Sequence, residues 1–236
     1  MKIIVYSDVH GNKYALDALR DSDDYKTADR RIFLGDAVSF CAYPNECIEI
    51  IKNSGDDALI GNHDVYCAYG IPEEEYENIN KKFLAHLDYI KNLTTEENKE
   101  FLRSLKHDIS FEEQGKKFYF THFIWVNDKI LAKNPDGKKQ PTTLTAEPFN
   151  SKVDANFVFF GHNHTAGIVE MNNKTYVCVG SLGVRSPGNY VVLDINENYV
   201  KIEPKRIEYN HKKLIEEMIE QDYPSAKVVI NYFGEK

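Results

Sequence analysis

Residues 3–11 read Ile-Ile-Val-Tyr-Ser-Asp-Val-His-Gly. Four apolar residues in succession, at positions 3–6, are typical of a strand that is buried on both faces, as strands of parallel sheets are. Asp8 and His10 follow where this strand ends, and Gly11 permits a sharp turn. The stretch therefore predicts a buried strand whose carboxyl end carries polar side chains.

The residues that follow alternate between helical and extended patterns. Asn12 is a helix cap before an amphipathic stretch, and Pro44 begins a second helix that Gly55 ends. Residues 31–34 and 57–60 are apolar runs that we interpret as further strands. This β-α-β-α-β order predicts a parallel sheet.

The rest of the chain adds helices and short strands to one domain that spans residues 1–236. Two helical patterns predict an insertion at about residues 72–105, and a helix at 211–221 lies in a predicted extension at about 205–236. A polar stretch at 126–152 predicts a long loop. The remaining predicted strands cover residues 109–113, 117–121, 157–160, 168–171, 176–179, 190–194 and 199–203.

Composition narrows the class of protein. The 236 residues include 29 Lys and Arg against 37 Asp and Glu, and the net charge of −8 argues against a nucleic-acid partner. No apolar run approaches the roughly 18 residues of a membrane span. Asp8 interrupts the first apolar run too early for a signal peptide, so we expect a cytoplasmic protein with four reduced cysteines. The sequence leaves the oligomeric state open.

Five predicted strands end in Asp, Asn or His. In open α/β sheets, ligands bind outside the carboxyl ends of the strands, and glycines beside these residues allow close backbone approach. Each fragment alone fits an ordinary surface turn, but five such turns together favour a functional site. The residues concerned are Asp8, His10, Asp36, Asn62, His63, His122, His162 and His164.

Carboxylate, imidazole and amide side chains without a thiolate suit Mn²⁺, Fe or Zn²⁺. Seven ligand-type residues from this set are too many for one tetrahedral ion, but they suit two ions that share a carboxylate. Two metals about 3.5–4 Å apart can hold both the attacking and the leaving oxygen in phosphoryl transfer. We therefore expect two divalent ions, with Mn²⁺ first and Fe, Zn, Ni or Co as alternatives.

In order and spacing, these residues resemble the calcineurin-like metallophosphoesterase superfamily. The resemblance implies an α/β fold, a two-sheet β-sandwich flanked by helices in four αββα layers. It implies that one metal is held by Asp8, His10 and His164, and the other by Asn62, His122 and His162. It also implies that Asp36 bridges the two ions opposite a bridging hydroxide, with His63 beside them.

The motifs are similar to the small prokaryotic phosphodiesterase branch of that superfamily. Protein Ser/Thr phosphatases have Asp-Arg-Gly after Gly-Asp, whereas Gly35-Asp36 is followed here by a segment that ends in Tyr-Pro-Asn-Glu at 43–46. Residues 180–183, Gly-Ser-Leu-Gly, resemble a further loop of the branch. The implied function is metal-dependent hydrolysis of a small phosphodiester or nucleotide-type substrate. A broad-range phosphomonoesterase and a non-catalytic scaffold are the alternatives.

Several other residues have two interpretations each. His63 is either the general acid or a residue that orients a ligand, and Asp64 either supports His63 or caps a turn. Arg185 either binds a phosphate oxygen or lies in solvent, and Trp125 either stacks on a base or packs in the core. The remaining histidines are expected at the surface: His86, His107 and His211.

Overall fold

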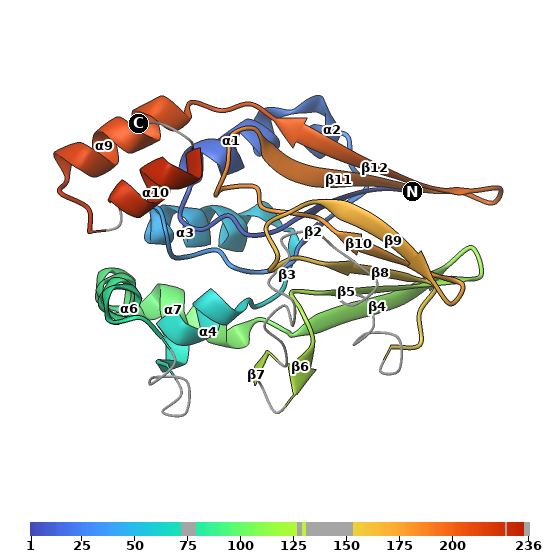
Figure 1. Ribbon diagram of the computed structural model, residues 1–236. Helices are drawn as coiled ribbons and strands as arrows, with labels where there is room; N and C mark the ends of the chain where they lie inside the picture. The colour runs from blue at the N-terminus through green and yellow to red at the C-terminus, as the bar shows by residue number, and fades with distance from the viewer. Residues whose placement is uncertain (72–78, 127–128, 131–152, 225, 234–236) are drawn as a thin grey trace.

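Two five-stranded mixed sheets face each other, and helices flank them (Figure 1). The computed structural model describes residues 1–71, 79–126, 129–130, 153–224 and 226–233. The predicted two-sheet sandwich with flanking helices is confirmed.

The first sheet has the order β12-β11-β1-β2-β3. Strands β1, β2 and β3 are parallel, as the sequence predicts, while β11 pairs antiparallel with β1 and β12 antiparallel with β11. The strand bounds are Lys2–Tyr6 (β1), Arg30–Phe33 (β2), Asp57–Ala58 (β3), Gly188–Ile195 (β11) and Val200–Ile207 (β12).

The second sheet has the order β4-β5-β8-β10-β9. Its three inner strands β5, β8 and β10 are parallel, and the two edge strands are antiparallel to their neighbours. The strand bounds are Asp108–Glu113 (β4), Lys116–Thr121 (β5), Phe157–Phe160 (β8), Gly167–Met171 (β9) and Lys174–Cys178 (β10).

The continuous apolar run of β1 is explained by the two cores that it separates. Ile3 and Val5 point toward the second sheet, where they join Phe118, Phe120 and Phe159. Alternate residues of β1 point to the opposite face, into a core lined by helices. Because successive side chains of a strand point to opposite faces, a strand between two apolar layers must be apolar throughout.

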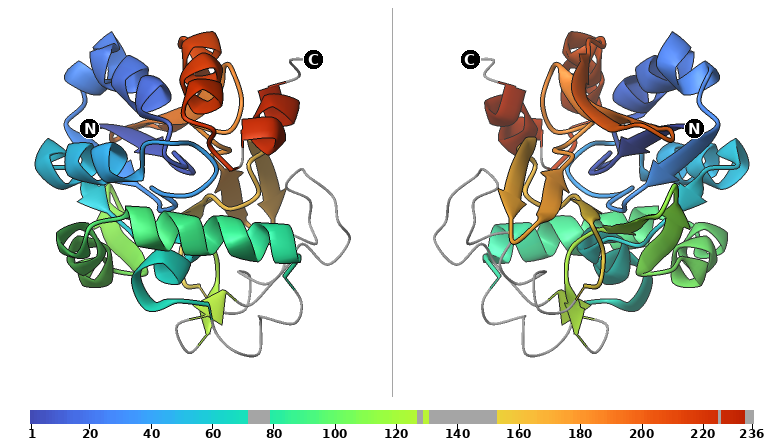
Figure 2. Two further views of the ribbon diagram at one scale, coloured as in Figure 1. Left: turned by 90° about the vertical axis from the view of Figure 1, so that its left-hand side faces the viewer. Right: turned by 90° about the vertical axis from the view of Figure 1, so that its right-hand side faces the viewer.

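Five helices pack on the outer side of the first sheet or next to it (Figures 1 and 2). Asn12 caps the first of them, with its side-chain oxygen accepting from the amide of Ala15 at 3.1 Å. Gly55 ends α3 with a φ of 74°. The bounds are Lys13–Asp21 (α1), Asp23–Lys26 (α2), Pro44–Ser54 (α3), His211–Glu220 (α9) and Ala226–Phe233 (α10).

Three more helices form a group next to α3, in which α4 packs against α6 and α7, and both α6 and α7 pack against α3. Helix α4 was not predicted. It begins at Asn62, and the strand expected at 57–60 is correspondingly short. Residues 72–78, the start of the expected insertion, lie outside the described part of the chain. The bounds are Asn62–Tyr69 (α4), Lys81–Leu93 (α6) and Glu96–Ser104 (α7).

The loop expected at 126–152 begins with a small hairpin instead. Strand β6 (Trp125–Val126) pairs antiparallel with β7 (Lys129–Ile130), and residues 131–152 are outside the described ranges. All four cysteines are buried and unbridged, as expected. Among the helices described, none has the length and apolar character needed to cross a bilayer.

A buried carboxylate ties the base of the first sheet to its helices. Asp56 has a fully buried side chain and accepts hydrogen bonds from the hydroxyls of Tyr6 (2.8 Å) and Tyr25 (2.8 Å) and from Nε of Arg31 (2.8 Å). Burial and the Asp56 charge raise the pKa of Tyr25 to about 12, so its hydroxyl donates at neutral pH. Neighbouring Asp57 is 44% exposed and pairs with Arg30.

We predict that Asp56→Ala lowers the free energy of unfolding by about 3–5 kcal/mol, because it leaves buried donors and a guanidinium without their acceptor. The matched change Asp57→Ala removes an exposed ion pair and should cost less than about 1 kcal/mol. Urea denaturation of both variants measures the difference. Equal losses would show that Asp56 does not anchor these side chains.

Candidate metal centre

The loops that follow the strands continue the pairing of the sheet. The amide of Asp8 donates to the carbonyl of Gly35 (2.9 Å), and the amide of His10 donates to that of Asp36 (3.0 Å). On the other side, the amide of Gly183 donates to the carbonyl of Asp8 (3.0 Å). These bonds bring residues from three distant parts of the sequence to one edge of the sandwich.

Five of the candidate ligands have a left-handed backbone, which non-glycine residues seldom adopt. Their φ angles run from 51° to 67°. Such conformations persist only where the surroundings enforce them, and they gather at functional sites. The five residues are Asp8, His10, Asp36, His162 and His164.

Two glycines let the ligand-bearing loops approach each other. A Cβ atom at position 61 would collide with Oδ1 of Asp36, and one at position 161 would collide with Oγ of Ser7 and Oδ2 of Asp8. The glycines at these positions are therefore part of what allows the carboxylates to enter the site.

Asp64 caps the turn that begins α4 and also fastens the neighbouring loop. Its buried carboxylate accepts from the amides of Gly61 (2.9 Å), Asp36 (2.8 Å), Ala37 (2.9 Å) and Val38 (3.3 Å). The capping interpretation of Asp64 thus holds. The same carboxylate joins the start of α4 to residues 36–43, the segment between β2 and α3 that we call the 36–43 loop.

The first donor group consists of Asp8, His10 and His164. Nε2 of His10 lies 2.9 Å from Nε2 of His164, and Oδ1 of Asp8 lies 3.2 Å from the latter and 3.6 Å from the former. Nδ1 of His10 donates to the carbonyl of Val38 at 3.0 Å, so Nε2 of the neutral ring carries a lone pair. Two ring nitrogens this close need a proton or a cation between them.

The second donor group surrounds Asn62. Its Oδ1 lies 3.1 Å from Nε2 of His122 and 3.0 Å from Nδ1 of His162. Asp36 lies between the two groups, because its Oδ2 is 3.3 Å from Nε2 of His122 and 3.8 Å from Nε2 of His10. The structure therefore brings all seven residues together, with Asp36 in the middle.

These residues fit divalent cations. Oδ1 of Asp8 and Oδ2 of Asp36 are buried and lack a hydrogen-bond partner among the described residues. Buried charged oxygens are costly unless they are paired or coordinate a metal. Nitrogen and oxygen donors converge on both, and neither donor group contains a cysteine. The donor set suits Mn²⁺, Fe or Zn²⁺.

The electrostatics of these residues also favour a cation at the site. Burial opposes ionisation of Asp8, but the neighbouring His10 and His164 rings hold its pKa well below the usual range. Burial also opposes protonation of His122, yet the Asp36 carboxylate raises the pKa of this ring to about 9. The two carboxylates thus draw positive charge into the site, which protons supply when no cation is present.

His63 lies beside the donor groups. Its ring is 5.0 Å from the His10 ring, centroid to centroid, and its amide donates to Oδ1 of Asp36 (2.8 Å). Burial lowers the pKa of the His63 imidazole to about 3 despite the Asp36 charge. One ring nitrogen of His63 falls within reach of Asp36 and His10, so His63 forms a third possible donor group.

Arg185 follows the 180–183 loop in the sequence. It is half-buried, and its carbonyl accepts from the hydroxyl of Tyr209 at 2.7 Å. The side chain of Trp125 lies outside the described part of the chain. Its neighbour Phe123 is buried, with its ring 5.1 Å from that of His162.

The expectation that His86 lies at the surface is wrong. The residue is only 3% exposed and contacts the 36–43 loop, with Nε2 3.0 Å from the amide of Phe40. Phe83, one turn earlier on α6, lies 5.8 Å from the His63 ring. A sequence signal existed, because Phe83, Leu87 and Ile90 mark the inner face of α6 and His86 falls on that face by its i+3 spacing.

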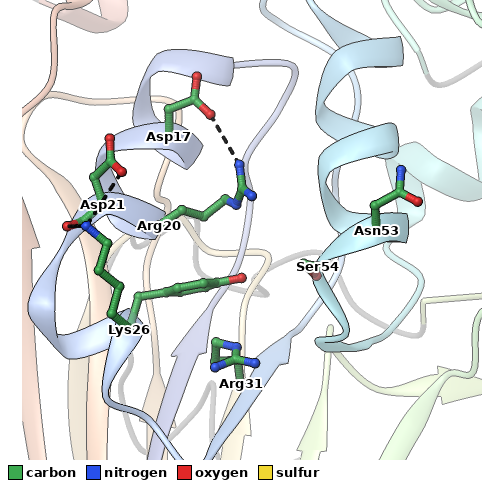
Figure 3. A pocket seen from close by; sticks show the side chains of 8 residues that line it. Asp17, Arg20, Asp21, Lys26, Arg31, Asn53 and Ser54 are labelled. Atoms are coloured by element: carbon green, nitrogen blue, oxygen red, sulfur yellow. Dashed lines mark hydrogen bonds and ion pairs between the residues drawn. The ribbon is translucent and has the colours of Figure 1, made fainter.

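A separate hollow of about 530 Å³ lies between α1, α2, β2 and the end of α3 (Figure 3). Arg20 and Lys26 line it but pair with Asp17 (3.6 Å) and Asp21 (3.7 Å). None of the seven candidate ligands lines this hollow. Arg31 also lines the hollow and pairs with Asp56, so each of the three cations has a carboxylate partner, and we assign no ligand to the hollow.

Comparison with known proteins identifies the family of this chain and supports its fold. The calcineurin-like phosphoesterase superfamily domain matches residues 1–198. An uncharacterized protein of Methanocaldococcus jannaschii is 29% identical over 247 residues, which cover 94% of this chain and 93% of that protein.

Two solved structures share the fold over nearly the whole chain. A hypothetical protein from Pyrococcus horikoshii OT3 has a TM-score of 0.78 at 22% identity and covers 100% of this chain and 99% of its own. A metallophosphoesterase from Sphaerobacter thermophilus has a TM-score of 0.69 at 20% identity, with 98% of each chain covered. With the domain match over residues 1–198, the chain belongs to the calcineurin-like phosphoesterase superfamily.

Proposed function

We propose that this protein is a metal-dependent phosphoesterase that hydrolyses a small phosphodiester or nucleotide-type substrate. The observation that carries the proposal is the pair of buried carboxylate oxygens of Asp8 and Asp36 that accept no hydrogen bond among the described residues and lie amid two converging donor groups. Membership of the superfamily supports hydrolysis as the class of reaction.

In this proposal Asp8, His10 and His164 hold one divalent ion, Asn62, His122 and His162 hold the other, and Asp36 bridges them. Mn²⁺ is the proposed metal, with Fe, Zn, Ni or Co as alternatives, because imidazole and amide donors suit these ions better than Mg²⁺. When bound, such ions lower the pKa of water and withdraw charge from phosphoryl oxygens.

Charge explains how an acidic protein could attract phosphate. The chain as a whole carries a net charge of −8. The proposed ligand set, however, contains only two carboxylates, those of Asp8 and Asp36. Two divalent ions outweigh these two negative charges, so the loaded site is locally positive. The attraction is confined to this edge of the sandwich, which fits a small substrate rather than a nucleic acid.

We assign His63 the role of proton donor to the leaving oxygen. Burial gives this ring a pKa of about 3 and keeps it neutral. Two divalent ions nearby would also disfavour the protonated form, so protonation has to be favoured by the negative charge of a bound phosphate next to the ring, which raises this pKa. His63 is also close to Asp36, whose carboxylate has the same effect.

Aromatic rings beside His63 support a substrate with an organic group on the phosphate. Phe40 lies 5.4 Å from the His63 ring and Phe83 lies 5.8 Å from it, and both are half-buried. Apolar rings at this position can contact the leaving alcohol. Arg185 and Trp125 stay proposed substrate contacts, the first for a phosphate oxygen and the second for a base.

We predict that Mn²⁺ at 100 times its Kd stabilises the metal-stripped protein by about 2.7 kcal/mol, which raises Tm by roughly 5–10 °C for a chain of this size. Asp36→Asn should abolish most of this rise, because it removes the shared ligand. Asp17→Asn, an exposed Asp on α1, is the control and should retain the rise. Scanning calorimetry of the three proteins decides whether Asp36 holds metal.

Hydrolysis should require metal and favour the phosphodiester and nucleotide-type substrates over the simple monoester. We expect the chelated protein to be inactive and Mn²⁺ to restore activity better than Mg²⁺. The panel comprises a nitrophenyl monoester, the corresponding diester, a cyclic nucleotide and a dinucleoside polyphosphate. Preference for the simple monoester would favour a broad phosphomonoesterase. Metal binding without any hydrolysis would instead favour the scaffold.

His63→Gln should retain metal binding and lower kcat about 10²–10⁴-fold if His63 is a general acid. The loss should be smaller for a nitrophenyl ester than for an alkyl ester, because nitrophenolate leaves without protonation. Steady-state kinetics on the two esters makes the comparison. Equal losses would assign His63 an orienting role.

A further inference from the structure

The 36–43 loop contains two consecutive residues in a strained conformation. Ser39 has a φ of 84° and Phe40 a φ of 56°. Non-glycine residues seldom adopt the left-handed conformation and hold it only where the surroundings enforce it, so this turn needs external restraint. The same loop carries Asp36 and, through the carbonyl of Val38, the acceptor that orients the His10 ring.

Helix α6 supplies such a restraint through His86. Nε2 of His86 lies 3.0 Å from the amide nitrogen of Phe40 and 3.1 Å from Oγ of Ser39. A backbone N–H can only donate, so Nε2 must be the unprotonated nitrogen and the hydroxyl of Ser39 must donate to it as well. One imidazole nitrogen therefore fastens both strained residues.

The state of His86 suits this role. Burial lowers the pKa of its ring to about 4, with a smaller effect from His10, so the acceptor nitrogen is available at neutral pH. The C-terminal segment contacts both His86 and the 36–43 loop. Tyr223 lies with its ring 6.1 Å from that of His86, and its hydroxyl donates to the carbonyl of Cys41 at 2.9 Å.

Phe40 passes this restraint on to the site. Its ring meets the His10 ring edge-on at 4.7 Å and lies 5.4 Å from His63 and 6.1 Å from His164. If the turn at 39–40 relaxed, the ring of Phe40 and the carbonyl of Val38 would both move. His10 would then lose two contacts that set the direction of Nε2.

We propose that His86 of α6 is a positioning residue of the metal centre, which holds the Ser39–Phe40 turn so that His10 and Asp36 keep their ligand geometry. This inference rests on the proposed function, because it assumes that His10 and Asp36 bind metal. The proposal gives helix α6 a supporting role at the metal centre, although none of the residues of this helix is a proposed ligand.

The test compares three variants. His86→Leu removes the acceptor, whereas His86→Gln places an amide oxygen near the position of Nε2 and can accept from Phe40. Leu87→Val is the matched control, because Leu87 is the buried neighbour on α6 and its truncation loosens the helix without touching the turn. Melting temperatures of all variants establish that each is folded at the temperature of the measurements.

The first readout is the Kd for Mn²⁺ of metal-stripped protein, measured by titration calorimetry. We expect His86→Leu to weaken binding about 10–100-fold, as loss of a group that orients a ligand does. His86→Gln and Leu87→Val should stay within about threefold of the unmodified chain. The proposal is overturned if folded His86→Leu binds as tightly as the unmodified chain, or if Leu87→Val weakens binding equally.

The second readout needs no metal. Amide hydrogen exchange of metal-free protein should be faster over residues 38–41 in His86→Leu than in His86→Gln or Leu87→Val. Unchanged exchange in His86→Leu would contradict the restraint. If the unmodified chain binds no divalent ion at all, the proposed function fails, while the exchange result still decides whether His86 holds the turn.

Discussion

The buried carboxylate of Asp64 is the constraint on which the candidate centre depends. It gathers four amides, one at the start of α4 and three from the 36–43 loop. Through them it fixes the backbone of Asp36, and through Val38 it fixes the acceptor of His10. Asp64 itself takes part in none of the three donor groups. A residue that binds only backbone thus sets the positions of side chains from two strand ends.

The parts of the fold that the sequence predicted are those with a strong local pattern. The apolar run of β1, the caps at Asn12 and Gly55 and the strands at 109–113 and 117–121 each have a local physical cause, and each is present. Helix α4 has no such pattern. It begins with three polar residues, Asn62 to Asp64, and is held by a capping carboxylate whose other partners are distant in sequence. Patterns within a short window cannot reveal such partners.

More of the candidate site than of the surrounding fold could be predicted from the sequence. Strand ends that carry Asp, Asn and His identified all seven residues that the structure brings together. What the sequence did not reveal was their support. The left-handed turn at 39–40 is occupied by Ser and Phe rather than glycine, and His86 lies 46 residues after Phe40 in the sequence. The place of His86 on the apolar face of α6 signals its burial, but its contact with this turn depends on tertiary packing that no local pattern encodes.

The burial of the cysteines has a chemical consequence for the centre. Cys178 lies at the end of β10, with Sγ 3.7 Å from the carbonyl of Gly161, immediately before His162. Burial raises the pKa of this thiol to about 12, so it stays protonated at neutral pH. Only the thiolate is a strong soft-metal ligand and nucleophile. The thiol of Cys178 is thereby withheld from copper-like ions and from alkylating or oxidising reagents, which leaves nitrogen and oxygen donors as the ligands that the candidate centre offers.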